Sequence, residues 1–316
     1  MASVTRQAAL PPLPYQDWAP TRRTVHLWAQ IVGKIRLALA PPRNHWWHAT
    51  LFVDVWGLTT RRLHTDATTF DITFDFADNR LLVRTSRGAA EDFGLHDGLS
   101  VAEFDAKLHD LLGRLTVDVP ILEKPYGVPM KVPFPEDRDH AAYDADAVHR
   151  FWRILDWVDD VFEEFAGWGV GKTSPPQLFW HSLDLAVTRF SGRSAPSVDG
   201  AGPVDAEAYS HEVISFGFYP GDDETPEPYF YSYTAPEPGG LAEHPLQPGA
   251  ARWNTGPAGS MAMLPYDTVR IAPDPRATLL AFMESAYEAG AEAAHWPRRD
   301  LVSSWCPPPV RERLER

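Results

Sequence analysis

Histidines occur close together at two places in the chain, and imidazole is the side chain best suited to move protons near neutral pH. His45 and His48 flank two tryptophans, and His211 stands beside Glu212 at the expected start of a strand. His48 or His211 could serve as the base, with Glu212 as a neighbouring carboxylate. The catalytic candidates are therefore His48, His211 and Glu212.

As an alternative, the same histidines could form a metal site. Three imidazoles and a carboxylate could bind Zn²⁺ or Fe²⁺ and leave one position open for substrate. The His-x-x-His spacing suits a helix or a loop, because alternate residues of a strand face opposite ways. Scattered histidines are more often structural, so no metal is assigned, and its candidate ligands are His45, His48, His181 and His211.

Two arginines could hold an anionic group. Arg189 and Arg193 follow an apolar strand, and each guanidinium can bind a carboxylate or phosphate through paired N–H donors. Trp47 could supply a flat apolar wall beside them, although most of the 12 tryptophans are expected to fill the core. The ligand-binding candidates are therefore Trp47, Arg189 and Arg193, and the expected ligand is a small anionic molecule.

Residues 166–173 fit a loose form of the phosphate-binding loop. That loop needs a strand before it and a helix N-terminus after it. Here a long amphipathic helix is expected before the segment, and Pro175 and Pro176 follow it. No nucleotide is therefore expected at Lys172.

Three tyrosines alternate along one expected strand, at positions 229, 231 and 233. They could line a pocket with apolar walls and hydroxyl groups, or they could cover one face of a sheet. The sequence favours the second interpretation. Two Gly/Pro-rich insertions, residues 192–207 and 235–262, show no periodicity and are interpreted as lids over a site or as surface loops.

The elements that would position these groups occur twice. Each copy has an apolar helix, the tripeptide Val-Gly-Lys, two prolines, a Trp-His pair and β-rich segments, with Trp47 matching Trp180. Hydrophobic periodicity and capping residues predict the elements. The expected helices cover 24–39, about 100–115, 144–165 and 274–294, and the expected strands cover 47–56, 69–76, 81–86, 178–190, 210–219 and 228–234.

The predicted fold is α+β, with two similar α-β-β-β-α halves. Their antiparallel sheets are expected to be related by a pseudo-twofold axis, with helices packed outside, since short connections favour antiparallel pairing. Such a fold would place a pocket between the halves. The predicted divisions are an arm (1–20), a first repeat (21–117), a linker (118–143), a second repeat (144–296) and a tail (297–316).

The composition argues against two classes of binding partner, nucleic acids and membranes. A formal net charge of −14 argues against nucleic acid binding, and no stretch of about 18 apolar residues could span a membrane. The single cysteine and the lack of a signal-peptide pattern near the start favour a cytoplasmic protein. The sequence leaves the oligomeric state open.

Several segments together resemble one bacterial family, domain-of-unknown-function family number 5996, over nearly the whole chain. The resemblance implies a stand-alone soluble protein and no stated activity. The family pattern more commonly has glycine at position 181, which weakens His181 as a ligand candidate. The segments that carry the resemblance are HLWAQIVGKIRL (26–37), NHWWH (44–48), FWRIL (151–155), DLAVTRFSGR (184–193) and SHEV (210–213).

These features predict a protein that binds or transforms a small anionic molecule in an aromatic-lined pocket between the halves, with His/Glu acid–base groups and an Arg anchor. The alternative is a non-catalytic interaction or structural protein whose tryptophans are only core. The sequence does not decide whether the protein is an enzyme.

Overall fold

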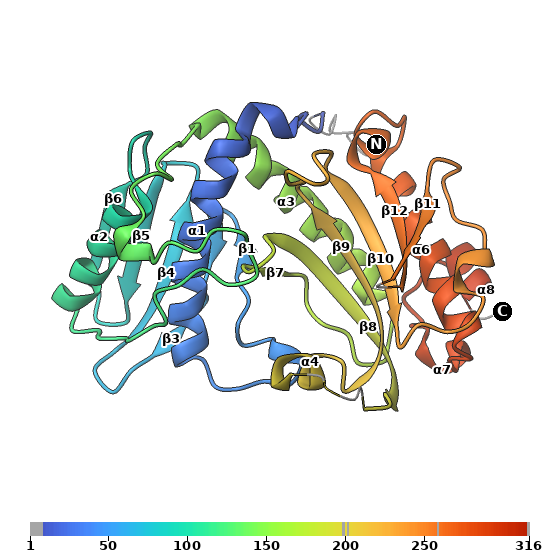
Figure 1. Ribbon diagram of the computed structural model, residues 1–316. Coiled ribbons are helices and arrows are strands. Elements are labelled where there is room, and N and C mark those ends of the chain that lie inside the picture. Colours follow the sequence, from blue (N-terminus) through green and yellow to red (C-terminus); the bar gives the residue numbers. More distant parts are fainter. Residues whose placement is uncertain (1–8, 198–199, 201, 258, 315–316) are drawn as a thin grey trace, which may run out of the picture.

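The computed structural model describes residues 9–197, 200, 202–257 and 259–314, which form two antiparallel sheets side by side with helices packed against them (Figure 1). The α-helices are α1 (Tyr15–Leu39), α2 (Val101–Arg114), α3 (Ala145–Gly167), α4 (Pro203–Ala208), α5 (Tyr266–Arg270), α6 (Pro275–Ala293), α7 (Arg298–Leu301) and α8 (Pro308–Leu314). The short 3₁₀ helices are η1 (Asn44–Trp46), η2 (Phe134–Glu136) and η3 (Leu241–Glu243).

The first sheet has the strand order β1-β2-β4-β5-β6, with β3 paired to β4. Helices α1 and α2 pack on one of its faces, where Trp28 stacks on Phe104 with ring centroids 4.9 Å apart. The opposite face carries the Asp71–Arg84 ion pair. The strands are β1 (Phe52–Asp54), β2 (Gly57–Thr59), β3 (Leu63–His64), β4 (Thr69–Asp75), β5 (Arg80–Thr85) and β6 (Ala90–Gly94).

The second sheet has the strand order β11-β12-β10-β9-β8-β7. Helices α3 and α6 cover one face, where Phe165 of α3 meets Phe216 of β9 edge to face at 4.9 Å. The strands are β7 (Gln177–Phe179), β8 (Asp184–Ser194), β9 (His211–Tyr219), β10 (Tyr229–Ala235), β11 (Arg252–Gly256) and β12 (Gly259–Pro265).

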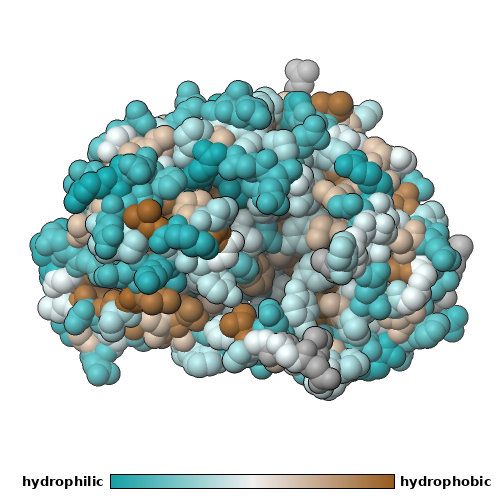
Figure 2. Space-filling view, in the orientation of Figure 1, coloured by the Kyte–Doolittle hydropathy of each residue, from teal (hydrophilic) through white to brown (hydrophobic). Residues whose placement is uncertain are grey.

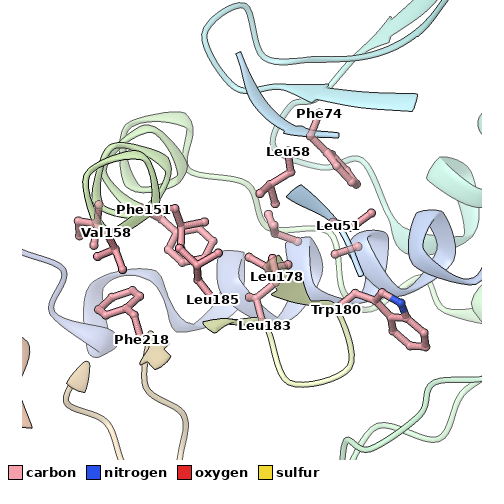
Figure 3. Close-up of a cluster of buried hydrophobic side chains, with 14 of the residues drawn as sticks. Leu51, Leu58, Phe74, Phe151, Val158, Leu178, Trp180, Leu183, Leu185 and Phe218 are labelled. Atoms are coloured by element: carbon pink, nitrogen blue, oxygen red, sulfur yellow. The ribbon is translucent and has the colours of Figure 1, made fainter. Parts of the chain in front are cut away.

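The two sheets touch at one point on their edges. Leu51 and Leu178 exchange two backbone hydrogen bonds of 2.9 and 2.8 Å. Buried apolar side chains continue across this contact, from Phe74 in the first sheet to Phe218 in the second, so one core serves both halves (Figure 3).

The helix predictions are confirmed where a local signal marks the start. Ser100 and Glu103 form the expected capping box of α2. Asp144 and Asp274 accept hydrogen bonds from the first turns of α3 and α6. The irregular arm expected over residues 1–20 is wrong in part, because α1 already begins at Tyr15.

Three strands were predicted for each half, and the described residues form six strands in each sheet. Segment 47–56 contains only the short strand β1 between turns, and segment 178–190 contains the end of β7, a turn and part of β8. The insertion at 235–262 holds η3, β11 and most of β12, and the one at 192–207 holds the end of β8 and most of α4. Strands β6 and β11 are largely exposed edge strands, so they carry no apolar alternation that a sequence pattern could reveal. The predicted combination of helices and antiparallel sheets is confirmed.

No helix within the described residues combines the length and the apolar content that a membrane crossing requires.

Candidate functional site

The face of the second sheet that turns away from α3 and α6 carries the three alternating tyrosines. Tyr231 and Tyr233 stack with ring planes 12° apart and centroids 6.2 Å apart, and Tyr229 follows at 6.5 Å from Tyr231. Strand alternation sends the intervening Phe230 to the helix side, where its ring lies 6.2 Å from that of Tyr266. The tyrosines therefore lie outside the main helix–sheet core.

Small residues lie beside these tyrosines in the neighbouring strands. Gly217 is paired with Tyr231, and a Cβ there would lie 2.2 Å from the tyrosine ring, so the ring rests flat on the glycine backbone. In the next row, the hydroxyls of Ser215 and Thr188 share a 2.9 Å hydrogen bond. We call this surface the tyrosine face; its residues are Ala186, Thr188, Ser215, Gly217, Tyr229, Tyr231 and Tyr233. In the space-filling view the molecule is hollowed near its middle, between the half that holds α1 and the half that holds strands β8–β10 (Figures 1 and 2).

One end of the tyrosine face meets the 3₁₀ turn η1 of the first half. His45 in this turn has φ +58°, a left-handed conformation that is uncommon outside glycine. Helix α4 holds the turn in place: the His45 N–H donates to the Glu207 carboxylate at 3.2 Å, and the Trp46 indole donates to the Val204 carbonyl at 3.0 Å. The insertion at 192–207 thus packs its short helix directly on η1.

The hydrogen bonds of His45 fix its tautomer. Its Nδ1 lies 3.0 Å from the Ala208 carbonyl, which can only accept, so Nδ1 carries the proton. In the neutral ring Nε2 then has a free lone pair, and the Lys172 Nζ donates to it at 2.5 Å. Burial lowers the pKa of both His45 and Lys172, which favours the neutral form of each.

Aromatic rings surround the lysine. The Lys172 Nζ lies 4.6 Å from the ring centroid of Phe190 and 5.4 Å from that of Trp47. The ring of His211 meets that of His45 edge to face at 5.7 Å. In the part of the chain that the structure describes, no carboxylate forms an ion pair with Lys172. We call His45, Trp47, Lys172, Phe190 and His211 the Lys172 cluster.

The other end of the tyrosine face is polar and mostly buried. Tyr231 and Ser182 both donate hydrogen bonds to the Asp184 carboxylate. Burial, and secondarily Asp184, raises the pKa of Tyr231 well above its usual value. From the first half, Arg22 of α1 donates to the Tyr219 hydroxyl at 3.2 Å. Contacts from both halves therefore meet here as well.

His26 of α1 lies deeper at this end. Burial, and next the nearby Arg22 charge, lowers the pKa of His26 to about 3, so the ring is neutral at physiological pH. The backbone of Trp180 and His181 lies close to the His26 ring and partly offsets this decrease of its pKa. Burial also lowers the pKa of His181.

The chain matches the family of unknown function DUF5996 over residues 10–303. It belongs to that family. No curated protein and no solved structure matches it. Membership in DUF5996 therefore confirms the resemblance found in the sequence, and the description of the family names no activity.

Among the residues that the sequence proposed for this DUF5996 chain, Trp47 and His211 lie in the Lys172 cluster. His48 lies to one side: its ring stacks on Trp46 at 5.3 Å, and the Arg43 N–H donates to its Nδ1 at 3.1 Å. Burial lowers the pKa of His48.

Arg189 points away from the site, so the structure corrects its proposed role as anchor. Its guanidinium lies 3.7 Å from the Phe165 ring centroid and 4.9 Å from that of Tyr287, and it donates to the Phe165 carbonyl. Burial lowers its pKa to about 10. The reason is strand alternation: Phe190 faces the Lys172 cluster, and its neighbour Arg189 faces the helices.

Arg193 and Glu212 form an ion pair of 2.7 Å with each other. Arg193 also donates to the Ala294 carbonyl at 2.7 Å, which ties the pair to the end of α6. His211 and Glu212 are adjacent on a strand and thus face opposite sides, so Glu212 does not join His211 on the tyrosine face. The proposed His–Glu pairing is therefore not formed.

The four proposed metal ligands do not converge. His45 and His211 approach each other, but His48 contacts Trp46, and His181 contacts Tyr126 at 6.2 Å between ring centroids. Within the described residues, no three His, Cys, Asp or Glu side chains are placed to hold a metal ion.

Two surface cavities lie elsewhere, at the C-terminal end of α6. The larger, about 510 Å³, is lined by Ala291, Glu292 and residues 295–300. The smaller, about 180 Å³, lies between Glu212, Trp296 and the 234–238 segment. The larger cavity is lined by eight residues of one segment, 291–300, whereas the Lys172 cluster brings together groups from both halves. The cluster is thus the stronger candidate site.

The sequence does not mark Lys172 as a site residue, because its motif resembles only a phosphate-binding loop and its partner His45 is far away in the chain. In the structure this segment lies alongside β8 and the C-terminal region: Thr173 pairs with Arg189, and Gly169 pairs with Val302. The alternation of the three tyrosines was the available signal for the tyrosine face. No sequence pattern placed Asp184 or Glu207.

Proposed function

We propose that this protein binds a small anionic molecule on the tyrosine face and that Lys172 holds the anionic group. The observation that carries the proposal is the setting of Lys172. On a chain with a net charge of −14, its ammonium group lies against two aromatic rings, and among the described residues no carboxylate forms an ion pair with it; Glu207 acts on it only as a nearby charge. A ligand carboxylate or phosphate would supply that partner.

The tyrosine face suits the body of such a ligand. The lack of a side chain at Gly217 lets the ring of Tyr231 lie flat on the sheet, and the partly exposed ring of Tyr233 stacked beside it offers a flat apolar wall. Tyr233 shares a 3.3 Å hydrogen bond with the exposed Tyr209, which extends the aromatic surface toward solvent. An aromatic or planar anion is the expected ligand.

His45 and His211 are the acid–base groups in this proposal, and they replace the pair His48 and Glu212. The neutral His45 presents the lone pair of Nε2 toward Lys172. His211 stands beside it and bonds to the Ser210 hydroxyl at 3.2 Å through Nδ1. Both could exchange a proton with a bound ligand.

We further propose that the two halves are related by a pseudo-twofold axis. Each half contains a long helix, an antiparallel sheet and a second helix in the same chain order. Contacts between the halves are reciprocal: the Nζ of Lys34 lies 5.7 Å from the ring centroid of Trp180, and that of Lys172 lies 5.4 Å from that of Trp47. A cytoplasmic location, drawn from the single cysteine, is part of the same proposal.

The binding proposal is tested with phenyllactate, which joins an aromatic ring to a carboxylate, in titration calorimetry. We expect Lys172→Met to weaken binding at least ~10-fold, equivalent to about 1.4 kcal/mol. Lys34→Met is the matched control, because Lys34 comes from the same tripeptide and lies against the other tryptophan; it should bind like the wild type. Equal affinity in wild type and Lys172→Met would overturn the proposal.

One observation favours the interaction-protein alternative. Trp305 is 90% exposed and Val170 is 61% exposed, on segments joined by the hydrogen bond from the Val170 N–H to the Leu301 carbonyl. Large exposed apolar side chains commonly mark contact surfaces. Sedimentation of wild type and Trp305→Ser at high concentration tests self-association through this surface.

A further inference from the structure

We propose that Lys172 forms an imine with the carbonyl group of a small 2-oxo acid, and that His45 takes up and returns the proton. This proposal rests on the proposed binding function and assigns it a ligand class. Three features support it: His45 can accept a proton from Lys172, aromatic rings lie beside the amine, and the positive charge stays at the Lys172 nitrogen after the imine forms.

The first feature is a proton acceptor already in contact with the amine. A protonated lysine is not a nucleophile, and it must lose a proton before it can attack a carbonyl carbon. The Lys172 Nζ donates to the Nε2 of His45, whose Nδ1–H is held by the Ala208 carbonyl. The orientation of the imidazole is therefore fixed before any ligand arrives, and the Glu207 carboxylate near the ring supports the imidazolium that forms.

The second feature is the environment of the amine. The rings of Phe190 and Trp47 lie against the partly buried Lys172 amine, and among the described residues no carboxylate forms an ion pair with it, although the charge of Glu207 acts on it from farther away. Burial of this kind disfavours the ammonium form and is one way in which proteins activate a lysine. Lys34 is also buried beside a tryptophan, but its ring neighbours are Trp180 and Phe134 and not a histidine. Lys172 is thus the lysine with both conditions met.

The reaction balances without an added oxidant or reductant. The Lys172 ammonium gives one proton to His45, and the free amine attacks the carbonyl carbon; a C–N bond forms as the C=O π bond breaks. One proton then moves from nitrogen to oxygen to give a carbinolamine. The His45 imidazolium protonates the departing hydroxyl, the C–O bond breaks, and water leaves. The products are a protonated imine, one water and neutral His45.

The charge explains why the ligand class is a 2-oxo acid. The protonated imine keeps the positive charge at the Lys172 nitrogen. A carboxylate on the adjacent carbon therefore stays paired with the same group before and after the reaction. The side chain of the acid would lie along Tyr233 and Tyr231, so an aromatic 2-oxo acid fits best.

The experiment uses phenylpyruvate, sodium borohydride and peptide mass mapping on the full chain. Borohydride reduces an imine to a stable secondary amine, and the chain has only five lysines, at positions 34, 107, 124, 131 and 172. We expect the adduct at Lys172, its loss in Lys172→Arg and its retention in Lys34→Arg. We expect His45→Gln to slow trapping at least ~10-fold, while His48→Gln, whose ring lies beside Trp46, does not. Circular dichroism checks that each variant is folded.

The outcomes separate the two proposals. If phenyllactate binds in a Lys172-dependent way but phenylpyruvate is not trapped at Lys172, the binding proposal stands and the imine proposal is wrong. If neither acid depends on Lys172, both are wrong. Labelling spread over the exposed lysines, unchanged in Lys172→Arg, would also overturn the imine proposal. Protection of Lys172 from trapping by excess phenyllactate supports both.

Discussion

The tripeptide Val-Gly-Lys occurs twice in this protein, and its two copies lie in different structural surroundings. Residues 32–34 lie inside α1, where Gly33 allows the indole of Trp180 to pack against the helix backbone. Residues 170–172 follow α3 and run beside β8, where Lys172 reaches His45. Both lysines lie against a tryptophan of the other half, but only the second meets a histidine. The same three residues thus serve packing in one half, and in the other they bring a lysine into contact with a histidine.

Gly33→Ala tests the copy of the tripeptide inside α1, residues 32–34, and should have the largest effect on stability. A Cβ at Gly33 would lie 2.2 Å from Cδ1 of the buried Trp180, so either the ring or the helix must move. We expect a loss of about 3 kcal/mol in the free energy of unfolding, measured with urea, despite the better helix propensity of alanine.

Two further glycine variants sharpen the comparison. In Gly171→Ala the closest atom is the tip of the Leu301 side chain at 2.7 Å, which can rotate away, so the loss should stay below about 1 kcal/mol. Gly113→Ala on α2 meets no atom within 4 Å and should be neutral or stabilising. If Gly33→Ala were as stable as Gly113→Ala, the close contact between α1 and Trp180 would be incorrect.

The second prediction concerns His26, which lies two turns before Gly33 on α1. Its folded pKa, about 3, lies below the value of ~6.5 for an unfolded histidine, so the unfolded chain binds the extra proton between these values. Stability should therefore fall as pH decreases through this window. The contribution of His26 is about 2 kcal/mol between pH 7 and pH 5.

Urea unfolding at several pH values checks this prediction. His26→Gln should show a shallower decrease in stability between pH 7 and pH 5 than the wild type. His96→Gln, at an exposed position, is the control for the replacement of a histidine by glutamine. Equal slopes in His26→Gln and wild type would show that the buried ring does not resist protonation.

The third prediction concerns the contribution of Lys34 to the free energy of unfolding, with Lys107 as the control. Lys34 is 8% exposed, its pKa is lowered by burial, and no carboxylate in the described part of the chain pairs with it. Lys34→Met should therefore raise the free energy of unfolding by about 1 kcal/mol, since methionine has a similar length and no charge to desolvate. Lys107→Met, at an exposed position of α2, should change it by less than about 0.5 kcal/mol. A destabilised Lys34→Met would mean that the ring contacts of Lys34 outweigh its desolvation.

Local signals explain which elements could be predicted. The capping residues Ser100, Asp144 and Asp274 contact only their own first turns, so the starts of α2, α3 and α6 were readable from a few neighbouring residues. Strands β6 and β11 lie at sheet edges with both faces largely exposed, so no apolar alternation marked them. The sequence pattern therefore gave half the number of strands in each sheet.

The candidate site was harder to predict than the fold. Trp47 and His211 both lie near His45, whereas Arg189 and Glu212 each point to the side of the sheet opposite the tyrosine face. A strand reverses the direction of its side chains at every residue, so an error of one position moves a group to the opposite side. Arg189 is thus a buried core cation, and its neighbour Phe190 contacts the site.

The amino-acid sequence by itself determined the α+β class, the family and the starts of the capped helices, because periodicity and capping depend on residues a few positions apart. Only the tertiary structure decided that Lys172 meets His45, 127 positions earlier in the chain. That contact depends on the left-handed turn at His45, on helix α4 holding this turn, and on the junction of the two sheets at Leu51 and Leu178. Each of these is a long-range packing result, and no short segment of the chain encodes it.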